Sequence, residues 1–232
     1  MMKRLITAFF VFSAMSLMAQ GIQGVPGFEG VFNASAVLNM SPIGKDLDNA
    51  MTEEEKKKLL EKQYLTQAYN PALIDDFTTT AFLRYNLYND QMEFVKNDKI
   101  YYMKKDKGRR VRFTTLNTLY KVYDLYGDLS FFLVKEEGEK ASLLVKQETR
   151  FIAPKKAQST YGVDKKANFK RRADVYFVAM GDKLVKLPKK KKEIPAIFGR
   201  NAKEVKTYIK KEKLNPKKDG DLKKIIKYYN TL

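Results

Sequence analysis

The chain has 232 residues, of which 45 are Lys or Arg and 27 are Asp or Glu, and it contains no His and no Cys. The absence of both residue types excludes disulfides, zinc sites built on these ligands, and nucleophilic triads with a His base. Chemistry that uses paired carboxylates, Lys or Tyr stays open. We expect no cofactor, no metal and no catalytic residues, in a chain long enough for one main domain with appendages.

Residues 1–19 have the pattern of a cleavable secretory signal peptide. Lys3 and Arg4 provide a positive start, an apolar stretch follows, and Ala19 is a small residue suited to a signal peptidase. The apolar stretch is shorter than the about twenty residues that a membrane-spanning helix needs. We therefore expect cleavage after Ala19 and a periplasmic or secreted protein with no transmembrane segment.

The rest of the chain divides into a lead-in, a β-rich domain and a basic helical tail packed on that domain, at residues 20–77, 78–187 and 188–232. The lead-in is rich in Gly, Ser, Asn and Pro but contains one helix signal. Thr52 and Glu55 have the spacing of a capping box, in which each side chain bonds to the backbone of the other residue. This spacing predicts a helix over residues 53–68, which Asn70-Pro71 ends.

The β-rich domain shows short strands joined by short turns. Leu83, Tyr85 and Leu87 alternate along one strand. Met92 and Phe94 fall on the opposite parity, which predicts a bulge or turn between the two groups. Hairpin tips are expected at residues 136–140 and at Gly181-Asp182. The pattern predicts a mainly β, α+β fold in which an antiparallel meander forms a sandwich or a barrel-like sheet, and the sequence leaves that choice open.

Two amphipathic helices are expected in the tail. Asn201 and Glu204 resemble an N-cap arrangement for the first helix. Asp221 is placed to cap the second, in which Leu222, Ile225, Ile226 and Tyr229 have helical spacing. Each helix therefore needs an apolar surface to cover, most simply the sheet or the other helix.

The positive charge is concentrated in two segments. Residues 154–172 form a basic loop of charge +6 and residues 188–232 carry +10, whereas the rest of the chain after residue 19 is balanced. The plain interpretation is a solvated Lys-rich surface, because Lys lacks the planar fork with which Arg recognises phosphate. The alternative is binding to lipopolysaccharide, to acidic glycan or to another envelope protein. The candidate residues for an anionic surface are Lys104, Lys105, Arg109, Arg110, Arg112, Lys165, Lys166, Arg171, Arg172, Lys189, Lys190, Lys191 and Lys192. No nucleic-acid-binding motif accompanies the charge, so we expect no specific nucleic-acid partner.

A polar site is a second candidate. Arg84, Asn86, Asp90 and Glu93 cluster near the expected bulge, where such side chains could bind a sugar or a cation. The competing interpretation is an exposed or half-exposed sheet face with satisfied side chains, because alternation places Arg84 and Asn86 opposite the apolar residues.

Three stretches together resemble uncharacterised exported proteins common in Bacteroidota: residues 84–94 (RYNLYNDQMEF), Ile100-Tyr101-Tyr102 and Ile226-Lys227-Tyr228-Tyr229-Asn230. The resemblance covers residues 80–232. It implies a cell-envelope or secreted protein of a Gram-negative bacterium, with a β-rich body and a helical tail that ends in a YYN-type motif. It implies no activity.

These observations favour an exported, non-catalytic envelope protein that serves as a binding or structural interaction module. In this hypothesis the basic helical tail approaches anionic lipopolysaccharide, a membrane surface or glycan. The first alternative is a carrier of a small apolar ligand in a β-barrel or clam-like cavity lined by Tyr and Phe. A less favoured alternative is a carboxylate-dependent glycan hydrolase, for which the sequence places no acid pair.

Overall fold

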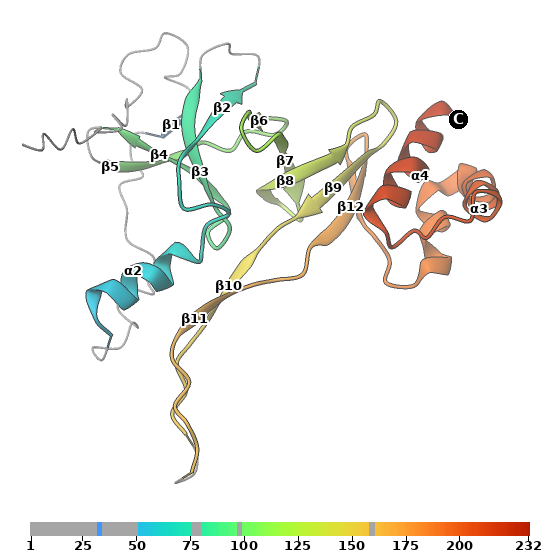
Figure 1. The fold of residues 1–232 in the computed structure, drawn as a ribbon. Helices are drawn as coiled ribbons and strands as arrows, with labels where there is room; N and C mark the ends of the chain where they lie inside the picture. The colour runs from blue at the N-terminus through green and yellow to red at the C-terminus, as the bar shows by residue number, and fades with distance from the viewer. Residues whose placement is uncertain (1–31, 34–50, 76–79, 97–98, 158–160) are drawn as a thin grey trace, which may run out of the picture.

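The computed structural model describes residues 32–33, 51–75, 80–96, 99–157 and 161–232 (Figure 1). The expected signal peptide and most of the lead-in before Met51 lie outside the described residues.

The described residues form strands β1 (Phe32–Asn33), β2 (Asn70–Ile74), β3 (Ala81–Asn86), β4 (Gln91–Lys96), β5 (Lys99–Met103), β6 (Arg110–Phe113), β7 (Thr118–Leu125), β8 (Asp128–Glu136), β9 (Ser142–Lys146), β10 (Thr149–Ile152), β11 (Asn168–Arg171), β12 (Val175–Met180) and β13 (Lys183–Lys186). The helices are α2 (Glu53–Glu61), the 3-10 helix η1 (Lys191–Asn201), α3 (Ala202–Lys211) and α4 (Asp219–Thr231). Eleven strands form one sheet in the order β1-β5-β4-β3-β2-β6-β7-β8-β9-β12-β13, and β10 pairs with β11. All pairs are antiparallel, which confirms the mainly β fold with helical appendages.

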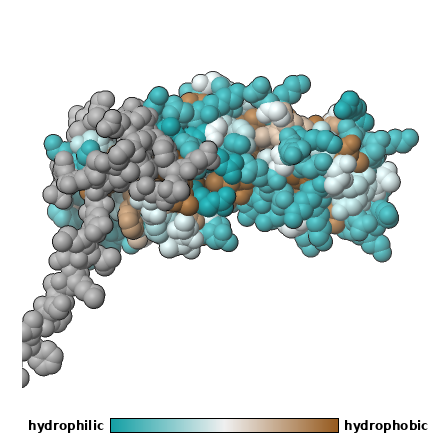
Figure 2. Space-filling view, turned by 90° about the horizontal axis from the view of Figure 1, so that it is seen from above, coloured by the Kyte–Doolittle hydropathy of each residue, from teal (hydrophilic) through white to brown (hydrophobic). Residues whose placement is uncertain are grey.

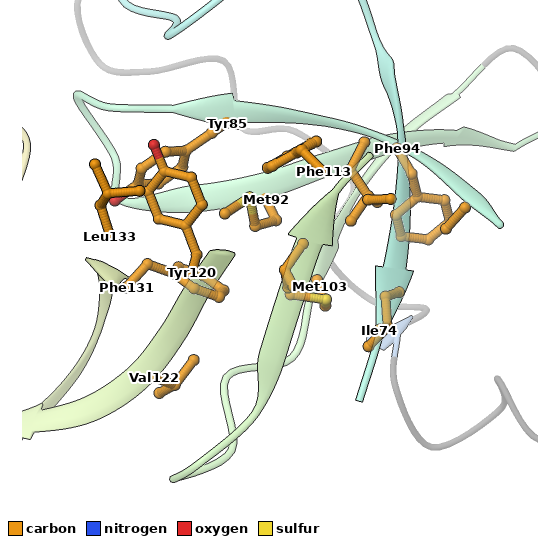
Figure 3. Close-up of a cluster of buried hydrophobic side chains, with 14 of the residues drawn as sticks. Ile74, Tyr85, Met92, Phe94, Met103, Phe113, Tyr120, Val122, Phe131 and Leu133 are labelled. Atoms are coloured by element: carbon orange, nitrogen blue, oxygen red, sulfur yellow. The ribbon is translucent and has the colours of Figure 1, made fainter. Parts of the chain in front are cut away.

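The large sheet is curled. Asp90 lies in the turn between β3 and β4, yet its carboxylate accepts a hydrogen bond from the Phe131 N–H of β8 at 3.3 Å. In a flat sheet, β3 and β8 would lie about 19 Å apart, at about 4.8 Å per strand. Figure 3 shows the side chains inside the curve, which point toward one another from β2 through β8. Most of them are exposed by 3% or less, among them Tyr85, Met92, Met103, Phe113, Tyr120 and Phe131.

Strand β2 differs from the expected order of elements. Helix α2 ends at Glu61 rather than near residue 68, and Asn70–Ile74 then forms a strand between β3 and β6. Asn70-Pro71 was expected to end the helix, and no strand was expected there; the Pro71 carbonyl accepts the Thr114 N–H at 3.0 Å and the strand continues through it. Ala72 and Ile74 are fully buried, so burial outweighs the local Pro signal. The sheet is therefore not a simple meander.

The tail packs on the sheet through η1, α3 and α4. Its buried side chains form one cluster with residues of β9 and β12: Leu143, Val178, Phe198, Val205, Leu222, Ile225 and Ile226. The two expected caps are wrong in detail. Asn201 is the N-cap of α3 but makes no side-chain capping bond, whereas Asp221 lies inside α4 and accepts the Asn215 N–H at 2.9 Å. The basic η1 segment has no counterpart in the expected helices.

Asn230, the last residue of the YYN motif, fastens α4 to the turn between β8 and β9. Its Oδ1 accepts the N–H groups of Lys140 and Ala141 at 2.8 and 2.9 Å, and its Nδ2 donates to the Ala141 carbonyl at 2.8 Å. A β-carbon at Gly138 would overlap the Asn230 amide, so this close approach requires Gly at that position. The motif is thus a structural contact.

No helix among the described residues is long and apolar enough to cross a membrane. Figure 2 shows the molecule from above, where the described surface is mostly hydrophilic, with hydrophobic residues in small scattered groups.

Candidate functional site

A two-stranded ribbon projects from the main sheet (Figure 1). Strands β9 and β12 pair in the sheet, and beyond them the same two chain segments pair again as β10 and β11. Lys155 and Lys165 extend the pairing as an isolated bridge. We call residues 149–172 the basic ribbon, since they contain eight Lys or Arg residues and a single acid, Asp164. The expected basic loop at residues 154–172 is therefore largely the outer part of this ribbon.

Most Lys and Arg residues of the basic ribbon form no ion pair with a described acidic residue. Lys166 pairs with Glu55 at 3.0 Å, Arg171 with Asp174 at 3.2 Å and Arg172 with Glu148 at 3.0 Å. The other five form no ion pair with any residue that the structure describes: Arg150, Lys155, Lys156, Lys165 and Lys170. All five are exposed.

Like charges face each other across the basic ribbon. The register pairs Arg150 with Lys170, and the bridge pairs Lys155 with Lys165. Like charges directly opposite each other on paired strands destabilise the pairing. The basic ribbon therefore has an unfavourable electrostatic energy that an anionic partner would relieve.

The far end of the basic ribbon exposes apolar side chains. Tyr161 is 99% exposed and Val163 is 85% exposed. The sequence prediction singled out neither residue. The sequence does contain a sign of the hairpin. Arg150 and Lys170, and likewise Lys155 and Lys165, lie at equal distances in sequence from residue 160, as the paired positions of a hairpin do.

Helix α2 braces the base of the basic ribbon. Leu59 of α2 packs with Ala167 and Phe169 of the ribbon in a small buried cluster. Lys62 also donates to the Asn168 side chain at 3.0 Å. A two-stranded hairpin is at best marginally stable alone, so these contacts explain how the basic ribbon keeps its position. The capping box of Thr52 and Glu55 is confirmed at the start of the same helix.

The candidate bases between β5 and β6 are mostly engaged by acids of the domain. Arg109 pairs with Asp75 at 3.2 Å and with Asp106 at 2.8 Å. Arg110 makes two hydrogen bonds to Glu137, at 2.6 and 3.0 Å, which lower the pKa of the Glu137 carboxyl. Further pairs join Lys104 to Asp106 and Lys105 to Asp90, whereas Arg112 is exposed.

The third group of candidate bases lies in the tail. Lys189, Lys190, Lys191 and Lys192 are exposed, and Lys190 lies 3.6 Å from Glu193. The basic ribbon points away from the helices of the tail (Figure 1). The bases of the basic ribbon therefore do not form one surface with the lysines of the tail.

Three of the four polar-site candidates come together on β3 and β4. Arg84 pairs with Glu93 at 2.8 Å, and Asn86 donates to Glu93 at 2.9 Å. Contrary to the expected exposed face, Asn86 and Glu93 are only 2% and 1% exposed. The Arg84 guanidinium lies 3.6 Å from the ring centre of Tyr64, whose phenol pKa is raised by burial. Asn86 also donates to Gln63 at 3.1 Å, and Arg84 Nε is a buried donor with no hydrogen-bond partner among the described residues.

The fourth candidate, Asp90, belongs to a different cluster, where it joins the β3–β4 turn to β8 and β9. Its carboxylate binds the Nζ atoms of Lys105 and Lys146, both at 2.7 Å, and accepts the Tyr85 hydroxyl at 2.5 Å. Lys146 is 5% exposed and also donates to the Phe131 carbonyl at 3.3 Å. Burial lowers the pKa of Lys146 and raises that of Tyr85. The cluster closes the curled sheet.

Comparison with known proteins adds no relative: no family model, no curated protein and no solved structure matches this chain.

Proposed function

We propose that the protein is an exported, non-catalytic component of the cell envelope, in which the curled sheet is a scaffold and the basic ribbon binds an anionic surface. One observation carries the proposal. A projecting ribbon keeps two like-charged pairs, Arg150 with Lys170 and Lys155 with Lys165, and no described acid neutralises them.

Like charges that face each other lower the stability of the basic ribbon. Opposite-charge pairs at the same positions would stabilise it. A surface rich in phosphate or carboxylate groups would turn that repulsion into attraction, by about 1 kcal/mol for each Lys or Arg near an anionic membrane surface. The periplasm or the outer surface of a Gram-negative cell provides such groups.

The basic ribbon is a better candidate than the other two groups of bases. Acids of the same domain already occupy Arg109 and Arg110. The helices of the tail bury apolar side chains against the sheet. This packing gives the tail a structural role that does not depend on its lysines. Among the residues that the structure describes, the basic ribbon buries apolar side chains only in the small cluster at its base.

The alternative function as a carrier of a small apolar ligand has less support. The side chains that would line such a cavity fill the inside of the curve and are themselves buried (Figure 3). A glycan hydrolase would need two carboxyl groups about 5–10 Å apart across an open substrate position. The buried Glu93 is paired with Arg84, and the half-buried Asp90 with two lysines, so both carboxylates have structural partners.

The test compares two variants that lose the same charge. In the first, Lys155, Lys156, Lys165 and Lys166 are all replaced by Gln, and in the second, Lys189–192 are replaced by Gln. Binding of the processed protein to lipopolysaccharide and to a sulfated glycan is measured across a salt series. We expect the ribbon variant to bind at least about tenfold more weakly and the tail variant to change little. Equal losses in both variants would contradict the proposal, because they would show a response to net charge alone.

A further inference from the structure

The end of the basic ribbon combines two kinds of side chain that are usually kept apart. Tyr161 and Val163 are among the most exposed apolar side chains of the described chain, at 99% and 85%. Lys155 and Lys165 stand opposite each other behind them, each donating its N–H to the other's carbonyl at 2.8 Å. Among the described residues, Tyr161 and Val163 therefore lie farther along the ribbon than Lys155 and Lys165.

We infer that Tyr161 and Val163 enter the interfacial layer of an anionic lipid bilayer while the lysines behind them bind the lipid head groups. The inference rests on the proposed function of the basic ribbon and names its partner. A polar glycan would satisfy the lysines but would leave Val163 without an apolar environment. Tyr is enriched at the interface between lipid and water, where its ring is apolar and its hydroxyl is hydrated.

The choice of Lys at this end agrees with a lipid surface. Lys155, Lys156, Lys165 and Lys166 are all Lys and all exposed, whereas Arg150, Arg171 and Arg172 lie nearer the base. Lys is a hydrated point charge on a long apolar stem, which can lie along apolar groups while its ammonium reaches water or a head group. Diffuse head-group charge requires no bidentate geometry.

A second turn of the same fold provides an internal comparison. Tyr126, in the turn between β7 and β8, is 84% exposed, but its neighbours Asp124 and Asp128 are acidic. An anionic bilayer would repel this turn and attract the end of the basic ribbon. Tyr126 and Tyr161 are both largely exposed, at 84% and 99%, so the main difference between the two turns is the charge around the Tyr.

The absence of Trp from the chain makes the inference directly testable. A Tyr161→Trp variant and a matched Tyr126→Trp variant each carry a single Trp. Each is mixed with phosphatidylcholine vesicles with and without phosphatidylglycerol. We expect the Tyr161→Trp emission to shift to shorter wavelength and to be quenched by brominated lipids, with anionic vesicles only. The Tyr126→Trp emission should not change.

A loss-of-function variant keeps the charge. Replacing Tyr161 and Val163 by Ser should weaken binding to anionic vesicles by about tenfold, with an unchanged circular dichroism spectrum. Vesicle binding without a shift of Tyr161→Trp emission would overturn insertion but leave the proposed function standing. So would binding to a sulfated glycan with no binding to vesicles. Failure to bind either probe would overturn both.

Discussion

Lys155 and Lys165 face each other across the basic ribbon as a hydrogen-bonded pair, with both N–H groups donating at 2.8 Å. Their side chains carry the same charge at directly opposite positions of the two paired segments. The same two positive charges therefore lower the stability of the basic ribbon and, in the proposed function, attract an anionic partner.

The variant Lys165→Glu should separate that cost from that role. An opposite charge facing Lys155 should stabilise the outer ribbon by about 0.5 kcal/mol, seen as slower amide hydrogen exchange at residues 155 and 165. The same variant should bind anionic surfaces more weakly, because it changes the local charge by two. The control Lys156→Glu makes the same change of charge without touching the Lys155–Lys165 pair. It should weaken binding without slowing exchange, and slower exchange in both variants would count against the repulsion.

Leu59→Ala should release the basic ribbon from helix α2. Leu59 is 3% exposed and packs on Phe169, so its truncation costs about 2–4 kcal/mol of local packing. We expect trypsin to cut faster at the lysines of the basic ribbon, with the tail cleaved at its usual rate. The exposed Lys58→Ala on the same helix is the control. Equal cleavage of the wild type and Leu59→Ala would show that α2 does not brace the basic ribbon.

Asp90→Asn should destabilise the curled sheet, because it leaves the buried ammonium of Lys146 next to Lys105 with no anion. Loss of one partner from a buried pair costs about 3–5 kcal/mol. Adding Lys146→Met should recover part of this loss, since the double variant no longer buries that charge. Urea unfolding of the two single variants and the double variant measures the coupling. Asp182→Asn, which breaks a fully exposed pair with Lys107, should leave the urea midpoint almost unchanged. If Asp90→Asn were equally mild, the cluster would not close the sheet.

Alkaline pH should unfold the protein through its buried tyrosines. Burial raises the pKa of Tyr123 and of Tyr176 to about 12, and that of Tyr85 well above its ordinary value of 10.0. The unfolded chain loses these protons first, so their stabilising contribution is complete below pH 10 and is lost as the pH rises toward 12. Burial lowers the pKa of Lys146, so this residue makes the folded state more stable as the pH rises. It is one group, whereas several tyrosines make the folded state less stable over the same range.

Urea unfolding at intervals from pH 8 to 11.5 measures this loss of stability. Tyr123→Phe should lose less stability than the wild type over the alkaline range, because position 123 no longer titrates. A free energy of unfolding that stays constant to pH 11.5 would contradict the assignment.

Local patterns predicted much of the fold. The hairpin tips at residues 136–140 and at Gly181-Asp182, the capped start of α2 and the two tail helices all depend on residues close together in the sequence, and the structure contains them. Strand β2 was missed because Asn70-Pro71 is a local stop signal. Its place between β3 and β6 is decided by burial of Ala72 and Ile74 in a core built from distant strands.

The candidate sites were harder to predict, because they depend on curvature. The turn before β4 directs Asp90 toward β8 and β9, away from Arg84, and no periodic pattern encodes a contact that exists only because the sheet curls. The ribbon was expected to be a loop since its strands lack an apolar alternation. Only its base, around Phe169, buries a face.

Chemical footprinting of lysines tests the central claim most directly. The processed wild-type protein is acetylated briefly, alone and bound to anionic vesicles, and each Lys is quantified by mass spectrometry. The proposed role of the basic ribbon predicts protection of Lys155, Lys156, Lys165 and Lys166, with Lys189–192 modified equally in both states. Protection of Lys189–192 while the lysines of the basic ribbon stay reactive would contradict it.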